Sequence, residues 1–210
     1  MDSYLKMKRF VLACLCVLLV SGYATATDKK KVLNGFDGGM MVHSGFLKGS
    51  LPQVGIETSG APIGIGGVLR LHLGKHWRLG SEGYVSTLPQ LHNGSYIKYG
   101  WGGLLGDFYL TAGRFMPFAG LTLGGGAQTS FLMMEEPAEE WGPVGETYFN
   151  KKGFMAIDPF VGCEFILTGA LHLTLKADWL LALGKSSSSG TMSLLRPTGP
   201  RIYFGFIFNH

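Results

Sequence analysis

The stretch LHLTLKADWLLAL at residues 171–183 alternates between apolar and polar side chains over most of its length. Its odd-numbered positions are all apolar, whereas positions 172, 174, 176 and 178 carry His, Thr, Lys and Asp. Successive side chains of a β-strand point to opposite faces, so a period of two is typical of a strand with one apolar and one polar face. We therefore expect a strand here that has one apolar face and one polar face.

The same period recurs along the chain, in segments separated by clusters of Gly, Pro, Asn and Ser that are typical of turns. The expected strands are 36–47, 61–73, 76–86, 96–109, 114–128, 154–166, 171–183 and 200–208. The expected short connections are 74–75, 111–113 and 168–170, and the expected long ones are 48–60, 87–95, 129–153 and 184–199. Eight antiparallel strands with connections that alternate in length predict an up-and-down β-barrel with both termini at its short-turn end.

The composition excludes several classes of protein. Hydrophobic residues make up 46% of the chain and charged residues only 15%, which disfavours a typical cytosolic enzyme. The apolar and aromatic content also excludes intrinsic disorder. After residue 26 no apolar run approaches the roughly 18 residues that a membrane-spanning helix needs, so a helical membrane protein is excluded as well.

The N-terminus has the layout of a secretory signal peptide. Basic residues at positions 6, 8 and 9 precede the apolar run FVLACLCVLLV, and the small residues Ala24, Thr25 and Ala26 follow it. We expect cleavage after Ala26, a short periplasmic segment at 27–35 and a barrel domain at 36–210, whether translation starts at Met1 or Met7. The remaining basic residues are scattered, so we expect no nucleic-acid partner.

Two kinds of barrel fit this pattern. A secreted, soluble barrel of the lipocalin type keeps its polar face outside, and it is the alternative architecture. The strands here carry too few charges to cover an outer surface, and an eight-stranded interior is only just wide enough for side chains, so it could not take up Trp77, Trp101 and Trp179 together with four apolar residues of 200–208. An inverted arrangement, with the apolar face in lipid and the polar face in the lumen, avoids both problems. We therefore expect a transmembrane barrel, with aromatic girdles that include Phe46, Trp77, Tyr109, Phe115 and Trp179.

The chain resembles the small eight-stranded outer-membrane proteins of Gram-negative bacteria, the group of the OmpA barrel, OmpX and the opacity proteins. The resemblance rests on this format over residues 33–208, on FMPFAGLTLG at 115–124 and on the aromatic strand at 199–208. It implies that the barrel-assembly machinery recognises the closing strand, with Tyr203, Phe206 and Phe208 as the assembly signal. In the family a Phe usually ends the chain, whereas Asn209 and His210 follow here.

The positions expected to face the lumen collect charges of both signs in nearly equal number. Charges in a narrow lumen must pair, because each unpaired one would carry a desolvation cost of several kcal/mol. Asp107 is expected on the lipid side, close to a strand end, where a charge is least costly. We predict a salt-bridged lumen formed by Asp37, Arg70, Arg78, Glu82, Lys98, Arg114, Asp158, Glu164, Lys176, Asp178 and Arg201.

The long connection at 129–153 carries both carboxylates and aromatic rings. Carboxylates alone would indicate a solvated loop, but together with exposed aromatic rings they predict a contact surface. The candidate contact residues are Glu135, Glu136, Glu139, Glu140, Trp141, Tyr148 and Phe149. We expect them to bind a protein partner at the cell surface or, through divalent cations, lipopolysaccharide; outer-membrane lipid is the other expected partner.

Three roles therefore remain open. The first is a structural, adhesive or envelope-interacting barrel, and the second is a narrow pore for small solutes. The third is a lipid-modifying enzyme; His43 and Ser44 are consecutive and face opposite ways, whereas Ser86, His92 and Ser95 near a long connection are not excluded. His72 and His76 flank a tight turn without forming a recognisable metal site, and no catalytic residue, cofactor or metal is assigned.

Overall fold

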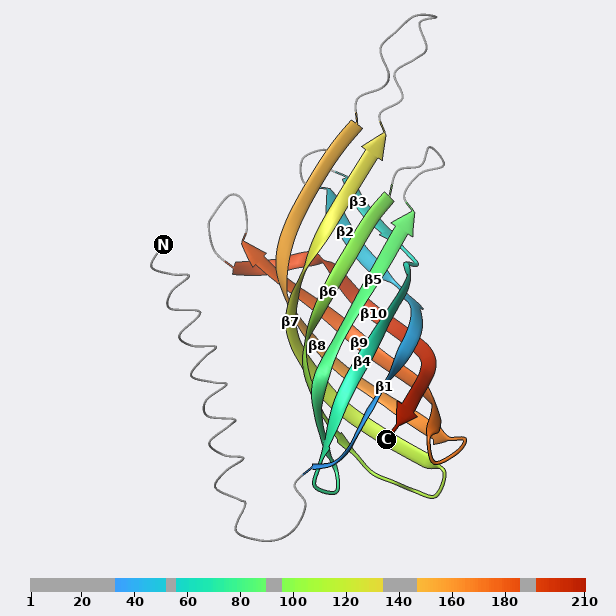
Figure 1. Ribbon diagram of the computed structural model, residues 1–210. Coiled ribbons are helices and arrows are strands. Elements are labelled where there is room, and N and C mark those ends of the chain that lie inside the picture. Colours follow the sequence, from blue (N-terminus) through green and yellow to red (C-terminus); the bar gives the residue numbers. More distant parts are fainter. Residues whose placement is uncertain (1–32, 52–55, 90–95, 134–146, 186–191) are drawn as a thin grey trace, which may run out of the picture.

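The structure is a computed structural model, and it describes residues 33–51, 56–89, 96–133, 147–185 and 192–210 (Figure 1). The expected signal peptide and residues 27–32 lie outside the described residues. The strands are β1 (Leu33–Gly45), β2 (Leu47–Leu51), β3 (Ile56–Gly60), β4 (Ile63–Leu73), β5 (Trp77–Pro89), β6 (Tyr96–Tyr109), β7 (Phe115–Met133), β8 (Thr147–Ile166), β9 (Leu171–Lys185) and β10 (Met192–Asn209).

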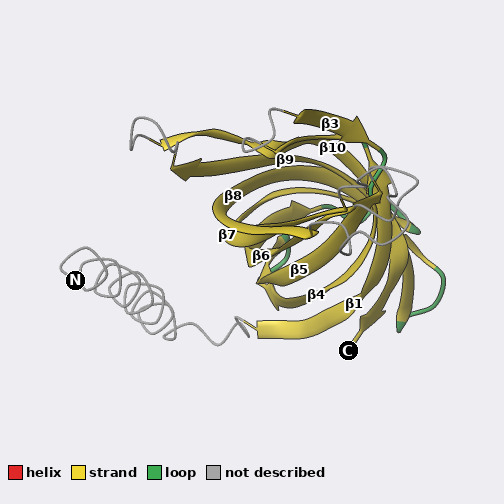
Figure 2. Ribbon diagram, turned by 90° about the horizontal axis from the view of Figure 1, so that it is seen from above, coloured by secondary structure: helices red, strands yellow, loops and turns green. Residues whose placement is uncertain are grey.

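Eight of these strands form a closed antiparallel barrel, which confirms the predicted fold class. The order around the barrel is β1, β4, β5, β6, β7, β8, β9 and β10, and β10 returns to β1 through a ladder from Asp37 opposite Asn209 to Gly45 opposite Arg201. Figure 2 shows these strands encircling the barrel axis. The described part of the chain contains no helix long and apolar enough to cross a membrane.

The two ends of the barrel differ. Three tight turns, the start of β1 and the C-terminus lie at one end, here called the turn end. Gly74 and Gly113 occupy two of those turns with φ angles of 61° and 64°, a conformation that favours glycine. The opposite end, here called the loop end, carries the long connections. The connection expected at 48–60 contains a further hairpin, β2–β3, whose strand β2 pairs with β10.

The hairpin of β7 and β8 is longer than predicted. Its ladder continues to Met133 opposite Thr147, so the connection expected at 129–153 is reduced to 134–146, and Tyr148 and Phe149 belong to β8. A membrane-spanning strand needs about 9 to 11 residues, so part of this hairpin extends beyond a membrane-sized segment. Figure 1 shows β7 and β8 rising together past the ends of β5 and β6.

The predicted faces are confirmed in seven of the eight expected strands. Large apolar side chains such as Leu69, Leu175 and Phe204 point outward and are exposed, whereas the alternate positions are buried inside the barrel. At the turn end the outer surface carries aromatic pairs, Trp77 with Phe108 and Phe115 with Phe165, whose ring centroids are both 5.2 Å apart.

The face of β6 is inverted relative to the prediction. Ile97, Tyr99, Trp101, Leu105, Asp107 and Tyr109 point into the barrel, and the outward positions include three glycines. Tyr109 therefore does not belong to an outer girdle. The pattern of β6 is ambiguous because glycine at 100, 102, 103 and 106 gives both faces a similar polarity.

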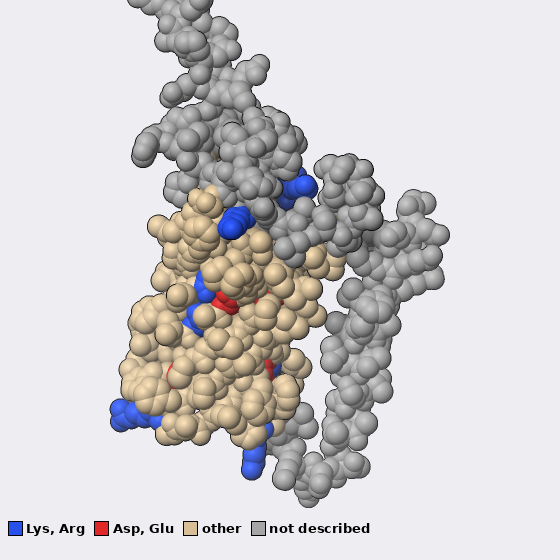
Figure 3. Space-filling view, turned by 180° about the vertical axis from the view of Figure 1, so that it is seen from behind, with Lys and Arg blue, Asp and Glu red and all other residues tan. Residues whose placement is uncertain are grey.

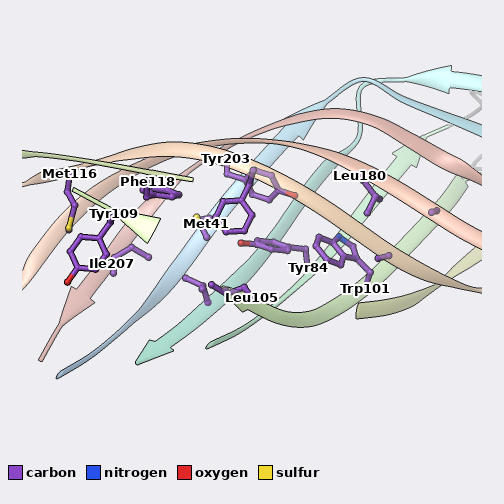
Figure 4. Close-up of a cluster of buried hydrophobic side chains, with 14 of the residues drawn as sticks. Met41, Tyr84, Trp101, Leu105, Tyr109, Met116, Phe118, Leu180, Tyr203 and Ile207 are labelled. Carbon is purple, nitrogen blue, oxygen red and sulfur yellow. The ribbon is translucent and has the colours of Figure 1, made fainter. Parts of the chain in front are cut away.

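Inward-facing glycines let aromatic rings lie flat on neighbouring strands. A Cβ atom at Gly66 would collide with the ring of Tyr84, and one at Gly162 would collide with the ring of Phe118. Figure 4 shows Tyr84, Trp101 and Tyr203 gathered in one part of the interior and Tyr109, Met116 and Phe118 in another. The interior is therefore packed by large side chains that occupy space above glycine backbone.

Candidate functional site

The lumen contains three groups of charged side chains, and the first lies near the turn end. Its centre is Glu164 on β8, whose Oε1 accepts hydrogen bonds of 2.8 Å from Arg70 on β4 and from Arg78 on β5. Asp37 accepts from Arg70 Nε at 2.6 Å, and Asp107 accepts from Arg78 Nε at 2.7 Å. All of these side chains are buried, and the exposed fraction of Arg78 is 0%. The group thus balances buried guanidinium groups with carboxylates, as burial of charge requires.

The second group lies nearer to the middle of the strands. Lys176 on β9 donates to Glu82 Oε2 on β5 at 2.7 Å, and Glu82 also accepts from Thr122 at 2.6 Å and from Tyr84 at 3.0 Å. The ammonium group of Lys176 lies 4.4 Å from the ring centre of Phe160, and the rings of Tyr84 and Tyr203 are also close. Aromatic faces attract a cation, so the rings supplement the ion pair of Lys176 with Glu82.

The third group lies towards the loop end. Arg201 on β10 donates to Asp178 on β9 through two hydrogen bonds of 2.8 and 2.9 Å, and to Asp158 on β8 at 3.2 Å. Its guanidinium carbon is 4.9 Å from the ring centre of Trp101. Two-point contacts of this kind are among the stronger ones that Arg makes, so Arg201 fixes β9 against β10.

Between the first and second groups lies an apolar layer that includes Met41, Leu105, Phe118 and Phe160. The cavity in this layer has a volume of about 10 Å³. A single water needs at least about that much space, so this cavity is large enough for about one water. The arrangement supports a plug of paired charges and aromatic rings rather than an open channel.

The structure places most of the predicted lumen residues inside the barrel, but two predictions are wrong. Lys98 points outward from β6 and is exposed, since the face of that strand is inverted. Arg114 lies in the tight turn before β7 and is exposed as well, because that strand begins at Phe115. Asp107, expected on the lipid side, is instead the partner of Arg78 in the lumen. In the sequence the charge of Asp107 indicates the correct inward face of β6, but Lys98 on the same strand indicates the opposite face.

A serine and a histidine that sequence reasoning did not pair meet inside the barrel. His43 Nε2 lies 2.6 Å from Ser86 Oγ, because the ring of His43 on β1 extends over Gly64 of β4 to reach β5. Both side chains are buried, and the rings of Tyr84 and Tyr203 lie against the ring of His43. His43 Nδ1 has no hydrogen-bond partner among the described residues, so no carboxylate orients the imidazole as in a catalytic triad. His92 and Ser95 lie outside the described residues.

The histidines at the turn end join the first charged group. His72 Nε2 lies 2.6 Å from Asp37 Oδ2, and His172 Nδ1 lies 3.1 Å from Glu164 Oε2. His76 instead contacts the carbonyl oxygen of Tyr109 at 3.1 Å, so it does not meet His72 at a common point. Within the described residues no group of three or more His, Cys, Asp or Glu side chains could hold a metal ion.

The remaining predicted sites are placed only in part. Glu135, Glu136, Glu139, Glu140 and Trp141 lie outside the described residues, and of Tyr148 and Phe149 the structure describes the backbone in β8. In the closing strand β10, Phe206 and Phe208 point outward and are about half exposed, whereas Tyr203 is buried in the lumen. Of the three predicted signal residues, only the two Phe rings therefore face outward, beside the outward side chains of Ile202 and Phe204.

Several solved structures share this fold. The chain is similar to Neisserial surface protein A, with a TM-score of 0.61 and 10% identity over 85% of this chain and 99% of that one. It is also similar to Ail, the attachment invasion locus protein of Yersinia pestis, with a TM-score of 0.50 and 9% identity over 86% of this chain and 100% of that one. No protein-family model matches the sequence, and no curated protein matches it. The fold is thus that of the small eight-stranded outer-membrane barrels.

Proposed function

We propose that the chain spans the bacterial outer membrane as a closed barrel with a plugged lumen, and that it acts structurally or adhesively at the cell envelope through its loop end. The signal peptide expected at 1–26 would direct its export. The observation that carries this proposal is the packing of the lumen: two layers of directly paired charges enclose an apolar layer whose cavity measures about 10 Å³.

The outer surface supports the membrane location. Exposed apolar side chains cover every strand of the barrel from β4 to β10, and closure leaves no strand edge without hydrogen-bond partners over the ladder from β10 to β1. Both properties are what a hydrocarbon environment requires of a spanning structure. Figure 3 shows this surface as a broad tan area with basic residues near its two ends and only small glimpses of charge at mid-height.

A role in conduction has less support. An ion would have to pass both the layer around Glu164 and the layer around Lys176, and in each layer the charges pair through direct contacts of 2.7 to 2.8 Å. A role in lipid modification also has less support, because Ser86 is 1% exposed and faces the lumen instead of the lipid. Contact through the loops therefore fits the geometry better than transport or catalysis.

The partners follow from this location. We propose that outer-membrane lipid and lipopolysaccharide surround the apolar belt and that the barrel-assembly machinery binds β10, whose Phe206 and Phe208 point outward. A protein partner at the cell surface would bind the connection at 134–146, where the glutamates alternate with apolar residues.

The membrane location is tested by electrophoresis of the detergent-extracted protein with and without heating. A closed membrane barrel stays compact in unheated SDS, so the unheated sample is expected to migrate faster than the heated one. Recovery of the folded protein from a surfactant-free periplasmic extract would contradict the location and favour the lipocalin-like alternative.

The plugged lumen is tested in planar bilayers. The purified protein is expected to insert without steady conductance at any salt concentration, and stable unitary currents would support the pore instead. Deletion of 134–146 is expected to abolish binding to cells or envelope components while the heat-dependent migration persists.

A further inference from the structure

The charges on the outside of the barrel have one sign only. Every carboxylate whose side chain the structure describes is buried in the lumen, whereas the exposed charged side chains of that same part of the chain are basic: Lys48, Lys75, Lys98, Arg114 and Lys151. Lys75 and Arg114 lie in turns at the turn end, and the other three lie towards the loop end. The outer surface is therefore complementary to anions at both edges of its apolar belt.

At the loop end two of these lysines lie in register. Lys98 on β6 is opposite Thr129 on β7, and Thr129 is opposite Lys151 on β8. Thr87 on β5 is opposite Lys98 on its other side. All four side chains belong to outward positions, so a single row across four strands alternates hydroxyl, ammonium, hydroxyl and ammonium groups.

The spacing of this row suits one anionic group. Neighbouring strands lie about 4.8 Å apart, so the Cα atoms of Lys98 and Lys151 are about 10 Å apart with Thr129 between them. The flexible four-carbon stems of both lysines can bring their ammonium groups together above Thr129. Neither lysine makes an ion pair with a described residue, so both remain available to an external anion.

The surface below the row is apolar and almost bare of side chains. The next outward row towards the turn end is Val85, Gly100, Ala127 and Gly153, and the row after it is Gly83, Gly102, Gly125 and Met155. The row that follows contains Leu104 and Leu123, which are 67% and 55% exposed. Hydrocarbon chains can approach the backbone closely at such glycines, and the larger side chains bound the area on the turn-end side.

We propose that Lys98 and Lys151 bind a phosphate of a multiply acylated, phosphorylated glycolipid, the lipopolysaccharide of the leaflet at the loop end, and that its acyl chains lie on the glycine-rich rows beneath. This inference rests on the proposed outer-membrane location. The ammonium groups supply the charge, and Thr87 and Thr129 supply hydroxyl donors to the remaining phosphate oxygens. Among the exposed cations that the structure describes, Lys98 and Lys151 are the two that share one row: Lys48 lies opposite Thr198 and Ser59 on other strands, and Lys75 and Arg114 lie in turns.

Binding is tested with the folded full-length barrel in detergent micelles, titrated with phosphorylated lipid A and followed by native mass spectrometry. A lysine near an anionic lipid surface contributes about 1 kcal/mol, so K98Q/K151Q is expected to bind lipid A roughly 30-fold more weakly. The matched control K75Q/R114Q also removes two exposed cations, but at the turn end, and is expected to bind like the unchanged protein. K98R/K151R keeps both charges and is expected to restore most of the affinity.

Two further probes identify the ligand group. Dephosphorylated lipid A is expected to bind the unchanged protein as weakly as phosphorylated lipid A binds K98Q/K151Q. Equal binding of both lipids, or an equal loss in K75Q/R114Q, would overturn the proposal, and displacement by an equal concentration of inorganic phosphate would show a general anion site instead.

The failure of this site is distinguishable from the failure of the membrane location. Each variant is first examined for heat-dependent migration and for insertion into phosphatidylcholine vesicles. A barrel that inserts but binds lipid A independently of Lys98 and Lys151 overturns the site alone, whereas a chain that never inserts overturns the location and the site together.

Discussion

Glu82 and Lys176 lie on diametrically opposite strands of the barrel, and their Oε2 and Nζ atoms are 2.7 Å apart. Arg70 and Glu164 form a second such connection, at 2.8 Å between β4 and β8. Direct contact across the lumen is feasible because eight strands enclose a space only as wide as side chains can fill. These two ion pairs, here called the cross-lumen pairs, connect opposite sides of the barrel.

Replacement of Lys176 by Met is expected to leave the carboxylate of Glu82 buried without a cation. Breaking a buried pair in this way costs about 3 to 5 kcal/mol of unfolding free energy. The measurement is urea-induced unfolding in phospholipid vesicles, followed by the loss of the compact electrophoretic band. Lys151→Met, on the outer surface, should change the unfolding free energy by less than about 0.5 kcal/mol.

The double variant Lys176→Met/Glu82→Gln completes this test. It removes both charges together, so it is expected to recover much of the stability that Lys176→Met loses. If the double variant instead loses the sum of the unfolding free energies lost by Lys176→Met and by Glu82→Gln alone, Glu82 and Lys176 do not act as a pair.

Gly66→Ala is expected to destabilise the barrel by about 1 to 3 kcal/mol, because the new methyl group would overlap the ring of Tyr84 and the backbone of Gly83. The matched control is Gly83→Ala on the adjacent strand, where the nearest atom to a Cβ would be 3.6 Å away. That control should stay within about 0.5 kcal/mol of the unchanged protein. Equal effects of the two substitutions on urea unfolding would contradict the described packing of Tyr84.

Leu175→Arg is expected to impair membrane assembly, since Leu175 is 55% exposed on the outer surface of β9. An Arg near the middle of a bilayer costs a barrel about 2 to 4 kcal/mol. The folded fraction after refolding into vesicles measures the effect. Thr174→Ser, at the neighbouring inward position, keeps a hydroxyl group and should refold normally; a normal yield of Leu175→Arg would argue that this side of β9 does not face lipid.

Cys163 provides a chemical test of orientation. It lies on the outer side of β8, opposite Pro117 on one side and Leu175 on the other, and it is partly exposed. In vesicles it is expected to react with a membrane-soluble maleimide and not with a charged, impermeant one. A lumenal thiol introduced as T122C in a C163S background, buried beside Glu82, should react with neither reagent; rapid labelling of Cys163 by the impermeant reagent would place this surface in water.

The sequence predicts the class of fold because three of the four expected strands that carry two charged residues place both charges on the same face. On β9, Lys176 and Asp178 both lie at positions of the inward face, and on β5 the same holds for Arg78 and Glu82. On β6 the two charged residues, Lys98 and Asp107, disagree, so parity alone could not show which one faces lipid. The structure resolves the disagreement in favour of burying Asp107, because Arg78 lies directly opposite on β5.

Other features depend on information that a linear pattern lacks. The contact of His43 with Ser86 needs the register of three strands and the empty space above Gly64. The extension of β7 and β8 was missed because the segment at 129–153 mixes polar, charged and aromatic residues without a clear period of two. The outward row of Lys98 and Lys151 follows only once the face of β6 is known.

The cross-lumen pairs also constrain how the barrel folds. Arg78 can meet Asp107, and Arg201 can meet Asp178, as soon as two neighbouring strands pair. Glu82 and Lys176 meet only when the sheet has curled far enough to bring β5 against β9, and Arg70 and Glu164 have the same requirement. In a partly curled sheet these charges are therefore unpaired, which raises the free energy of that intermediate. Assembly is then cooperative, because intermediates in which β1 and β10 have not yet paired are unstable.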